Sequence, residues 1–316
     1  MRACEFIRCA LSISVATALL CACGGSSIPL IASDTTTNGR GALKNNKTFY
    51  YTGKKQTFIV PASVTQLTVV AHGGEGGGFS VYPSGNTPGL PARVYAVIPV
   101  HPGDKLYVFV GGSGTHGGFN GGGAGGAAGY HGSYPGNPGG GASDVRVGGD
   151  ALADRIIVAA GGGGAGEAID AYAYGYGGKG GGVTGQSGGA GGSPYGDGEG
   201  GAGGTQSQGG SGGAGGVVSS RYYLDGEPGG NGAVGLGGGG GNSAPYCDAA
   251  GGGGGGGGYY GGGGGGGGAG AYSCIYAGNG GGGGGGSSYV EPSAIKSRMW
   301  TGWKRKGDGL VVFSWK

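Results

Sequence analysis

The side chains that could do chemistry are few and lie far apart in the chain. The four histidines show no metal-ligand spacing: His72, His101, His116 and His131. His116 and His131 could approach one another with Asp144, which would make a metal or acid–base cluster. Histidines in surface loops are much commoner than such clusters, and no serine lies in a nucleophile elbow between a strand and a helix. We therefore expect no enzyme activity, no metal and no cofactor.

Phosphate and calcium loops are not predicted either. A chain with 97 glycines in 316 residues meets the Gly-x-Gly-x-x-Gly pattern by chance, and none of the matches opens a helix. Asp144, Asp197 and Asp248 do not recur at the spacing of calcium-binding β-roll repeats. A net charge of +3 without a concentrated basic face argues against a nucleic-acid partner.

Aromatic residues form the remaining candidate site. Two tryptophans precede the basic run 304–306, and this combination could bind a glycan, an anionic lipid or a partner protein. The structural alternative, which we favour, makes Trp315 and one other tryptophan core residues and residues 304–306 a solvated turn. The candidate binding surface comprises Tyr172, Tyr174, Tyr176, Tyr259, Tyr260, Trp300 and Trp303.

The first 22 residues are predicted to be a signal peptide. Arg2 and Arg8 flank a short basic region, and residues 9–22 form an apolar run that is too short to span a bilayer. Residues 20–24 (LCACG) resemble the lipobox of bacterial lipoproteins, with Cys23 as the lipid acceptor. The alternative is an ordinary secretory signal that is cleaved near Ala22.

Lipidation would place the protein in the cell envelope. Residues 23–49 then form a lipidated N terminus and a flexible polar tether. In a bacterium with an outer membrane, Gly24 rather than aspartate after the cysteine suggests an outer-membrane lipoprotein that faces the periplasm or the cell surface. The membrane would be contacted only through the N-terminal lipid.

Cysteine use agrees with export. Cys4, Cys9 and Cys21 would leave with the signal peptide, so the mature chain keeps only Cys247 and Cys274 besides the lipid acceptor. Two cysteines in an exported glycine-rich domain most simply form a disulfide. Closing that loop would constrain the unfolded chain by roughly 3–4 kcal/mol. A metal site needs more ligands than this pair supplies.

Short runs rich in β-branched and aromatic residues predict an all-β domain over residues 50–316. The expected strands are Gln56–Val60, Gln66–His72, Ala92–Val100, Lys105–Val110, Ser143–Val147, Arg155–Ala160, Ser287–Val290 and Leu310–Trp315. No window after the signal has a helical period. Because strands lie at both ends of this domain and between glycine blocks, we expect two packed sheets with glycine-rich insertions at about 111–142, 161–216 and 226–286.

The glycine runs admit two interpretations. The longest are Gly237–Gly241, Gly251–Gly258, Gly261–Gly268 and Gly280–Gly286. Such segments are commonly disordered linkers, because glycine has no side chain to bury and loses much entropy on ordering. They can also form polyglycine II helices, whose outward N–H and C=O groups bond to neighbouring helices. We expect the ordered bundle, because linkers rarely alternate with strand blocks inside one domain.

Several stretches carry a family resemblance. They are residues 57–61 (TFIVP), 64–69 (VTQLTV), 118–123 (GFNGGG), 140–146 (GGASDVR), 154–166 (DRIIVAAGGGGAG) and 308–315 (DGLVVFSW). Together they resemble the bacterial glycine-rich domain family and, more distantly, the extracellular glycine-rich domain of the anaplastic lymphoma and leukocyte tyrosine kinase receptors. The resemblance implies a tumour-necrosis-factor-like, jelly-roll-type β-sandwich with inserted polyglycine helices. No ligand-contact residue can be transferred.

These observations lead to an expected function. The chain should be a surface-anchored, non-enzymatic lipoprotein that acts as an adhesion or binding module for an extracellular protein or glycan. The alternative is a structural envelope or matrix protein that assembles through its glycine-rich rods.

Overall fold

The computed structural model describes residues 43–78, 87–129, 134–169, 175–219, 223–245, 249–271 and 277–316. The chain divides into two units, Met1–Arg40 and Gly41–Lys316, and all of the described residues lie in the second. Two five-stranded antiparallel sheets and one two-stranded sheet account for its regular structure, apart from two short 3₁₀ turns. The predicted all-β class is confirmed.

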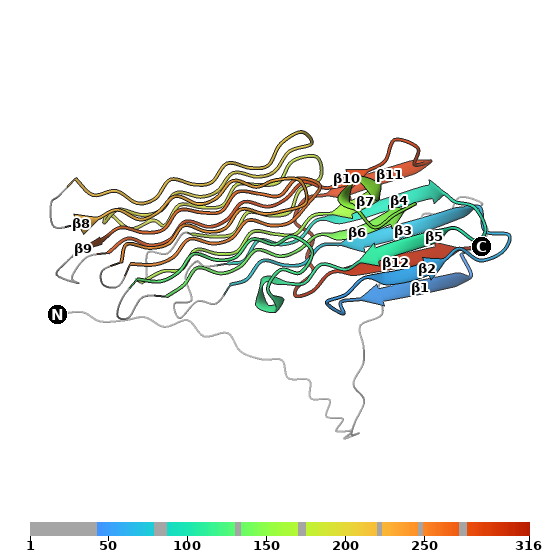
Figure 1. Ribbon diagram of the computed structural model, residues 1–316, viewed down its shortest axis with the longest axis horizontal. Helices are drawn as coiled ribbons and strands as arrows, with labels where there is room; N and C mark the ends of the chain where they lie inside the picture. The colour runs from blue at the N-terminus through green and yellow to red at the C-terminus, as the bar shows by residue number, and fades with distance from the viewer. Residues whose placement is uncertain are drawn as a thin grey trace, which may run out of the picture. The chain divides into compact units, whose positions relative to one another are not determined.

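The two large sheets draw their strands from both ends of the unit (Figure 1). Sheet A has the order β1 (Asn45–Tyr50), β12 (Leu310–Trp315), β3 (Gln66–His72), β4 (Arg93–Pro99) and β11 (Lys296–Trp300). Sheet B has the order β10 (Tyr289–Val290), β7 (Arg155–Ala159), β6 (Ser143–Val147), β5 (Lys105–Phe109) and β2 (Gln56–Ile59). The small sheet pairs β8 (Tyr223–Leu224) with β9 (Gly270–Ala271).

Every expected strand region contains a strand, and four further strands form: β1 and β11 in sheet A, and β8 and β9 in the small sheet. β1 begins before residue 50, where the sequence suggested that the domain starts, and β11 lies in a stretch without expected structure. Both strands lie at the edges of sheet A and expose most of their residues. Their sequences therefore lack the apolar alternation that marks a half-buried strand.

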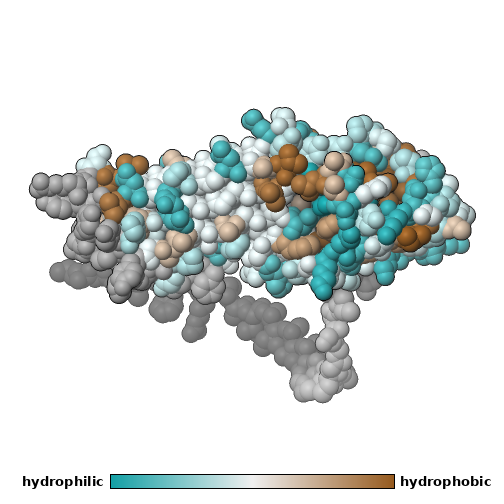
Figure 2. Space-filling view, in the orientation of Figure 1, coloured by the Kyte–Doolittle hydropathy of each residue, from teal (hydrophilic) through white to brown (hydrophobic). Residues whose placement is uncertain are grey.

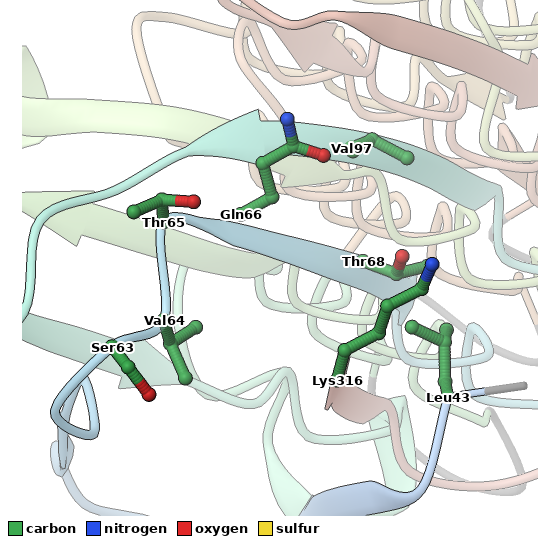
Figure 3. Close-up of a pocket in the computed structure, with 8 residues that line it drawn as sticks. All are labelled: Leu43, Ser63, Val64, Thr65, Gln66, Thr68, Val97 and Lys316. Carbon is green, nitrogen blue, oxygen red and sulfur yellow. The ribbon is translucent and has the colours of Figure 1, made fainter. Parts of the chain in front are cut away.

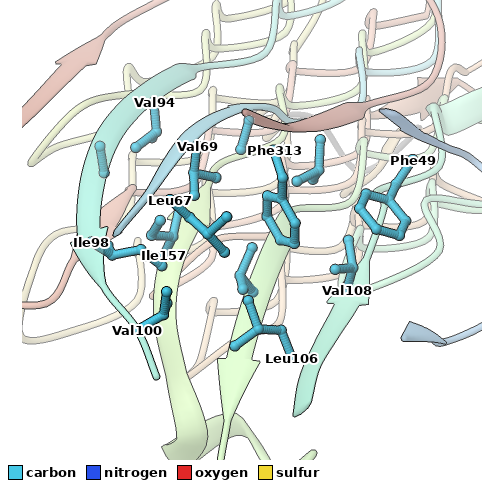
Figure 4. Packing of buried hydrophobic residues seen from close by; sticks show 14 of the residues in the cluster. Phe49, Leu67, Val69, Val94, Ile98, Val100, Leu106, Val108, Ile157 and Phe313 are labelled. Atoms are coloured by element: carbon cyan, nitrogen blue, oxygen red, sulfur yellow. The ribbon is translucent and has the colours of Figure 1, made fainter. Parts of the chain in front are cut away.

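A single hydrophobic core lies between the two large sheets (Figure 4). In β3 the residues alternate, so Leu67 and Val69 are fully buried while Thr68 and Val70 lie on the outer face. Phe313 contributes the largest fully buried side chain, and its ring lies 5.1 Å from that of Phe58. Trp315 packs against this cluster, as expected for the closing strand.

The glycine-rich segments extend beside one another from the end of the two sheets (Figure 1). The runs at 251–258, 261–268 and 280–286 are buried at every residue. In Figure 2 this half is pale, because glycine is neither strongly hydrophilic nor hydrophobic, whereas the surface of the sheets mixes both kinds. Burial here is thus achieved without apolar side chains.

Hydrogen bonds in the glycine runs repeat every three residues. Within 251–257, the N–H groups of every third residue donate to one neighbouring segment, at N···O distances of 2.8–3.1 Å. The first set reaches residues 134–140, the second 238–241 and the third 281–284. Successive peptide groups therefore point in three different directions.

The carbonyl groups of the same run follow the same period. They accept from residues 161–167, 123–126 and 262–265, again at 2.8–3.1 Å. Residues 251–257 are thus bonded to six neighbouring segments. Their N–H groups donate to three of these segments, and their carbonyl groups accept from the other three. Runs 261–268 and 280–286 show the same three-residue alternation.

Outer segments of the bundle carry a side chain at every third position. Gly210, Gly213 and Gly216 are buried and donate to the carbonyls of run 261–268. The residues that follow each of these glycines, Ser211, Ala214 and Val217, are exposed. A Gly-Gly-X period in the sequence therefore marks a segment at the surface of the bundle.

Candidate aromatic and basic binding face

The hypothetical histidine–aspartate cluster does not form among the described residues. His116 Nδ1 lies 2.8 Å from Asp308 Oδ1 rather than near Asp144. The Asp144 carboxylate instead accepts from Arg146, with an Nε–Oδ1 distance of 2.7 Å. His131 lies outside the described residues, and those that are described contain no group of three or more potential ligands placed to hold a metal.

Several other candidate residues lie outside the described part of the chain. They are Cys23, Cys247, Cys274, Tyr172 and Tyr174. Lipidation and the disulfide therefore stay predictions. Tyr176 is described and is 48% exposed on the glycine-rich half.

Tyr259 and Tyr260 form a packing cluster at the junction between the bundle and sheet B. The Tyr259 ring stacks on Tyr289 of β10, with a centroid distance of 4.3 Å and an interplanar angle of 12°. Arg155 lies 5.1 Å from the Tyr259 ring and donates to the carbonyls of Gly258 and Tyr259. These contacts cap the end of run 251–258, so we assign the pair a structural role.

Trp300 and Trp303, by contrast, come together around an arginine. Their ring centroids lie 5.8 Å apart, and the Arg93 guanidinium lies 4.6 Å from each centroid. Arg298 lies 4.7 Å from the Trp300 ring on its own strand. A cation over the face of an indole is attracted by the quadrupole of the ring, and these contacts help to hold the side chains in position.

The strand register explains this meeting. Arg93 of β4 pairs with Trp300 of β11 on one side and with His72 of β3 on the other. Trp303 arrives from the β11–β12 loop, where its N–H donates to the Pro91 carbonyl at 2.7 Å. Three strands and one loop, far apart in sequence, therefore supply the cluster.

His72 lies beneath the cluster and is 8% exposed. Its ring centroid is 6.3 Å from that of Trp303, and its Nδ1 atom has no hydrogen-bond partner among the described residues. Burial, with the positive charges of Arg305 and Arg93, lowers the pKa of His72 from 6.5 to about 3. The imidazole is therefore neutral at pH 7, with two arginines nearby.

The outer face of sheet A continues this basic character. None of its five strands contains an aspartate or glutamate. Lys296 and Arg298 of β11 are exposed, and Val70 and Tyr95 lie partly exposed between them and β12. Edge strands often carry lysine or arginine to prevent pairing with other chains, so β11 alone has a structural explanation.

A shallow pocket of about 200 Å³ lies at the other end of the same face (Figure 3). Its polar lining comes from the start of β3, the turn before it and the C terminus: Ser63, Thr65, Gln66, Thr68 and Lys316. Ser63 adopts a φ of 70°, which is uncommon for a residue other than glycine. Hydroxyl, amide and ammonium groups therefore line the pocket, together with Leu43, Val64 and Val97.

Sequence reasoning identified the two tryptophans but missed their partners. Arg93, Tyr95 and His72 carry no local signal, because only the antiparallel register of β3, β4 and β11 brings them together. The expected solvated turn is present in part, since Lys304 and Lys306 are exposed while Arg305 Nε donates to the Asp308 carbonyl at 3.0 Å. Neither Trp300 nor Trp303 belongs to the described core cluster, unlike Trp315.

Neither a membrane-spanning helix nor a similar known protein helps to identify the site. Within the described ranges, no helix is long and apolar enough to span a bilayer. No protein-family model matches the chain, and no curated protein matches its sequence.

Proposed function

We propose that the chain is an exported, non-enzymatic binding or adhesion module that a lipid on Cys23 tethers to the cell envelope. The observation that carries the proposal is the Trp300–Arg93–Trp303 cluster on the outer face of sheet A. Its 37%-exposed Trp303 ring lies beside a basic strand rather than in the core. Aromatic and arginine side chains held in this way are typical of recognition surfaces.

The proposal includes polyglycine II helices in a bundle beside a jelly-roll-type sandwich. A helix with three residues per turn directs successive peptide groups about 120° apart, and this agrees with the three-residue hydrogen-bond period of residues 251–257. At a rise of ~3.1 Å per residue, an eight-residue run would be a rod of about 25 Å. Such a bundle would act as a stiff support for the sheets.

Assembly through glycine rods is the second candidate, and the outer segment 209–217 disfavours it. A rod that accepted another molecule's rod would need glycine at its outward positions. Those positions carry side chains in the outer segment 209–217, where Ser211, Ala214 and Val217 are exposed. Side chains there keep a second backbone from approaching to hydrogen-bonding distance.

Cell binding and light scattering test the proposal. The chain with Cys23→Ser should be a monomer by light scattering and should bind intact cells saturably. Unlabelled wild-type chain should compete, whereas the Trp300→Ala/Trp303→Ala variant should compete at least about tenfold more weakly. Growing assemblies with unsaturable binding would instead support the structural candidate. Fatty-acid labelling of the original chain but not of the Cys23→Ser variant would establish the anchor.

A further inference from the structure

We propose that the outer face of sheet A binds an acidic polysaccharide, with carboxylates at the Lys296–Arg298 end and sugar hydroxyls in the pocket at Thr68. This inference rests on the proposed function, because it names the ligand class of that same face. The argument combines charge, an unpartnered buried atom, the aromatic rings and the distance between the two ends.

Charge selects an acidic ligand. Lys296, Arg298 and Arg93 lie on adjacent strands of one face, in a sheet whose strands contain no carboxylate. Arginine guanidinium groups bind carboxylates in a bidentate manner, and they do so most strongly where they are partly removed from water. Arg298 lies 4.7 Å from the Trp300 ring, so an acidic group that pairs with it would lie beside that ring.

The buried end of this face contains an unpartnered polar atom. His72 Nδ1 is enclosed beneath Trp303 without a hydrogen-bond partner among the described residues. A buried polar atom of this kind requires an explanation, such as a bound water or ligand. A hydroxyl group, or a water held by one, can either donate to the neutral imidazole or accept from it.

The opposite end of the face suits a hydroxyl-rich chain rather than an acidic peptide. The pocket there is lined by the Lys316 ammonium, by apolar side chains and by three hydroxyl side chains that each donate and accept hydrogen bonds, those of Ser63, Thr65 and Thr68. Thr68 and His72 lie four residues apart on β3 and on the same side of the sheet. At ~3.4 Å per residue, they are separated by about 14 Å, which an extended polymer but not a small ligand would span.

Edge protection explains only part of this arrangement. Lysine and arginine on β11 would discourage pairing with another sheet. Arg93 lies on the inner strand β4, however, and both His72 and the pocket lie on or beside β3, away from that edge. A ligand that runs along β3 from the pocket and reaches over β4 to β11 accounts for all of these features together.

Binding to polygalacturonate tests the inference, with neutral dextran of matched length as the reference polymer. The full chain with Cys23→Ser should bind polygalacturonate, bind dextran much more weakly and lose affinity as salt is added. Lys296→Glu/Arg298→Glu should weaken binding at least about tenfold, and Trp300→Ala by a similar factor. Thr68→Val should weaken it about threefold while the chain melts at an unchanged temperature.

The matched control reverses two charges away from the proposed site, one in the β1–β2 turn and one on β5 of sheet B. Lys54 and Lys105 are exposed, and Lys105 lies 5.1 Å from the Tyr107 ring, so Lys54→Glu/Lys105→Glu changes the net charge equally and disturbs a similar cation–aromatic pair. This variant should bind within about twofold of wild type.

Equal losses in both double variants would overturn the inference, as would a wild type that binds vesicles containing phosphatidylglycerol but not polygalacturonate. Saturable binding to cells with no binding to polygalacturonate would refute the ligand class and leave the proposed function standing.

Discussion

The sandwich and the glycine bundle exclude water by opposite means. Between the sheets, large side chains such as Phe313, Leu67 and Ile98 are fully buried and fill the space. In the bundle, runs such as 251–258 are equally buried but contribute only backbone, which is satisfied by lateral hydrogen bonds. One region is therefore held by apolar volume and the other by peptide groups in register.

The two regions should consequently respond in opposite ways to a change of side-chain size. Removing atoms leaves a cavity in the sandwich, because neighbouring side chains relax only partly. Adding atoms disrupts the bundle, because backbone cannot move aside as a flexible side chain can. The predictions below test this contrast.

Phe313→Ala should have the largest effect. The ring is fully buried and contacts both Phe49 and Phe58, at centroid distances of 5.2 and 5.1 Å. Its removal should lower the free energy of unfolding by about 3–5 kcal/mol, measured by chemical denaturation. A loss below about 1 kcal/mol would mean that the sheets do not share one packed core.

Gly265→Ala should cost nearly as much although it adds only one carbon. A Cβ at this position would overlap the carbonyl oxygen of Gly281 in the neighbouring run. We expect the free energy of unfolding to fall by about 3 kcal/mol, the upper end for overpacking.

Gly239→Ala is the matched control. Gly239 is exposed, and the nearest atom to an added Cβ is the Ala124 carbonyl oxygen at 3.9 Å. This substitution should change the free energy of unfolding by no more than about 1 kcal/mol and should tend to stabilise, because alanine restricts the unfolded chain. Equal costs for the two substitutions would contradict a close-packed bundle.

His72 should make the stability of the sandwich depend on pH. Its folded-state pKa of about 3 is below the unfolded value of 6.5, so the unfolded chain binds more protons between these values and stability falls as pH is lowered from 6.5. Between about pH 6.5 and 4.5 the loss should be about 2–3 kcal/mol, at ~1.36 kcal/mol per unit.

His72→Leu removes the titrating group and supplies the comparison for that prediction. The pKa of Asp308 is lowered below 3.8, because hydrogen bonds from His116 and Ser113 outweigh its burial, so that carboxylate titrates outside the window. The variant should therefore lose much less stability over the same range in parallel denaturation curves. An unchanged pH dependence would show that the imidazole is not buried as described.

Replacing the outward side chains of the bundle should affect stability only through the unfolded chain. The triple variant Ser211→Gly/Ala214→Gly/Val217→Gly keeps the inward hydrogen bonds of residues 210–216. Each added glycine should lower the free energy of unfolding by roughly 0.5–1 kcal/mol, because glycine gives the unfolded chain more conformational freedom. The variant is informative mainly because it could self-associate, since its outer segment would expose bare backbone. Concentration-dependent light scattering should show self-association for this variant and not for wild type. A monomeric variant would show that these side chains do not guard the surface.

Much of the fold was predictable because the strands carry local signals. The alternation of Leu67, Val69 and Ala71 and the turn at Pro102-Gly103 identify β3 to β5 without further information. Edge strands such as β11 lack this alternation, because most of their residues face solvent. The Gly-Gly-X period around Ser211 and Ala214 was also present in the sequence and separates the surface segments of the bundle from its centre.

The candidate site was less predictable because it is assembled by register. Trp300 and Trp303 attract attention as aromatics beside a basic run, yet Arg93 and His72 lie more than 200 positions earlier in the chain. Nothing local distinguishes Arg93 from any arginine that opens a strand. Only the pairing of β4 with both β3 and β11 places these side chains on one surface.

Amide hydrogen exchange of residues 251–257 tests the central claim most directly. Each of these N–H groups donates to a neighbouring segment, so we expect exchange as slow as that of the buried strand β3. Exchange at the rate of a free glycine peptide would contradict a backbone-packed bundle and, with it, the rigid support on which the binding face depends.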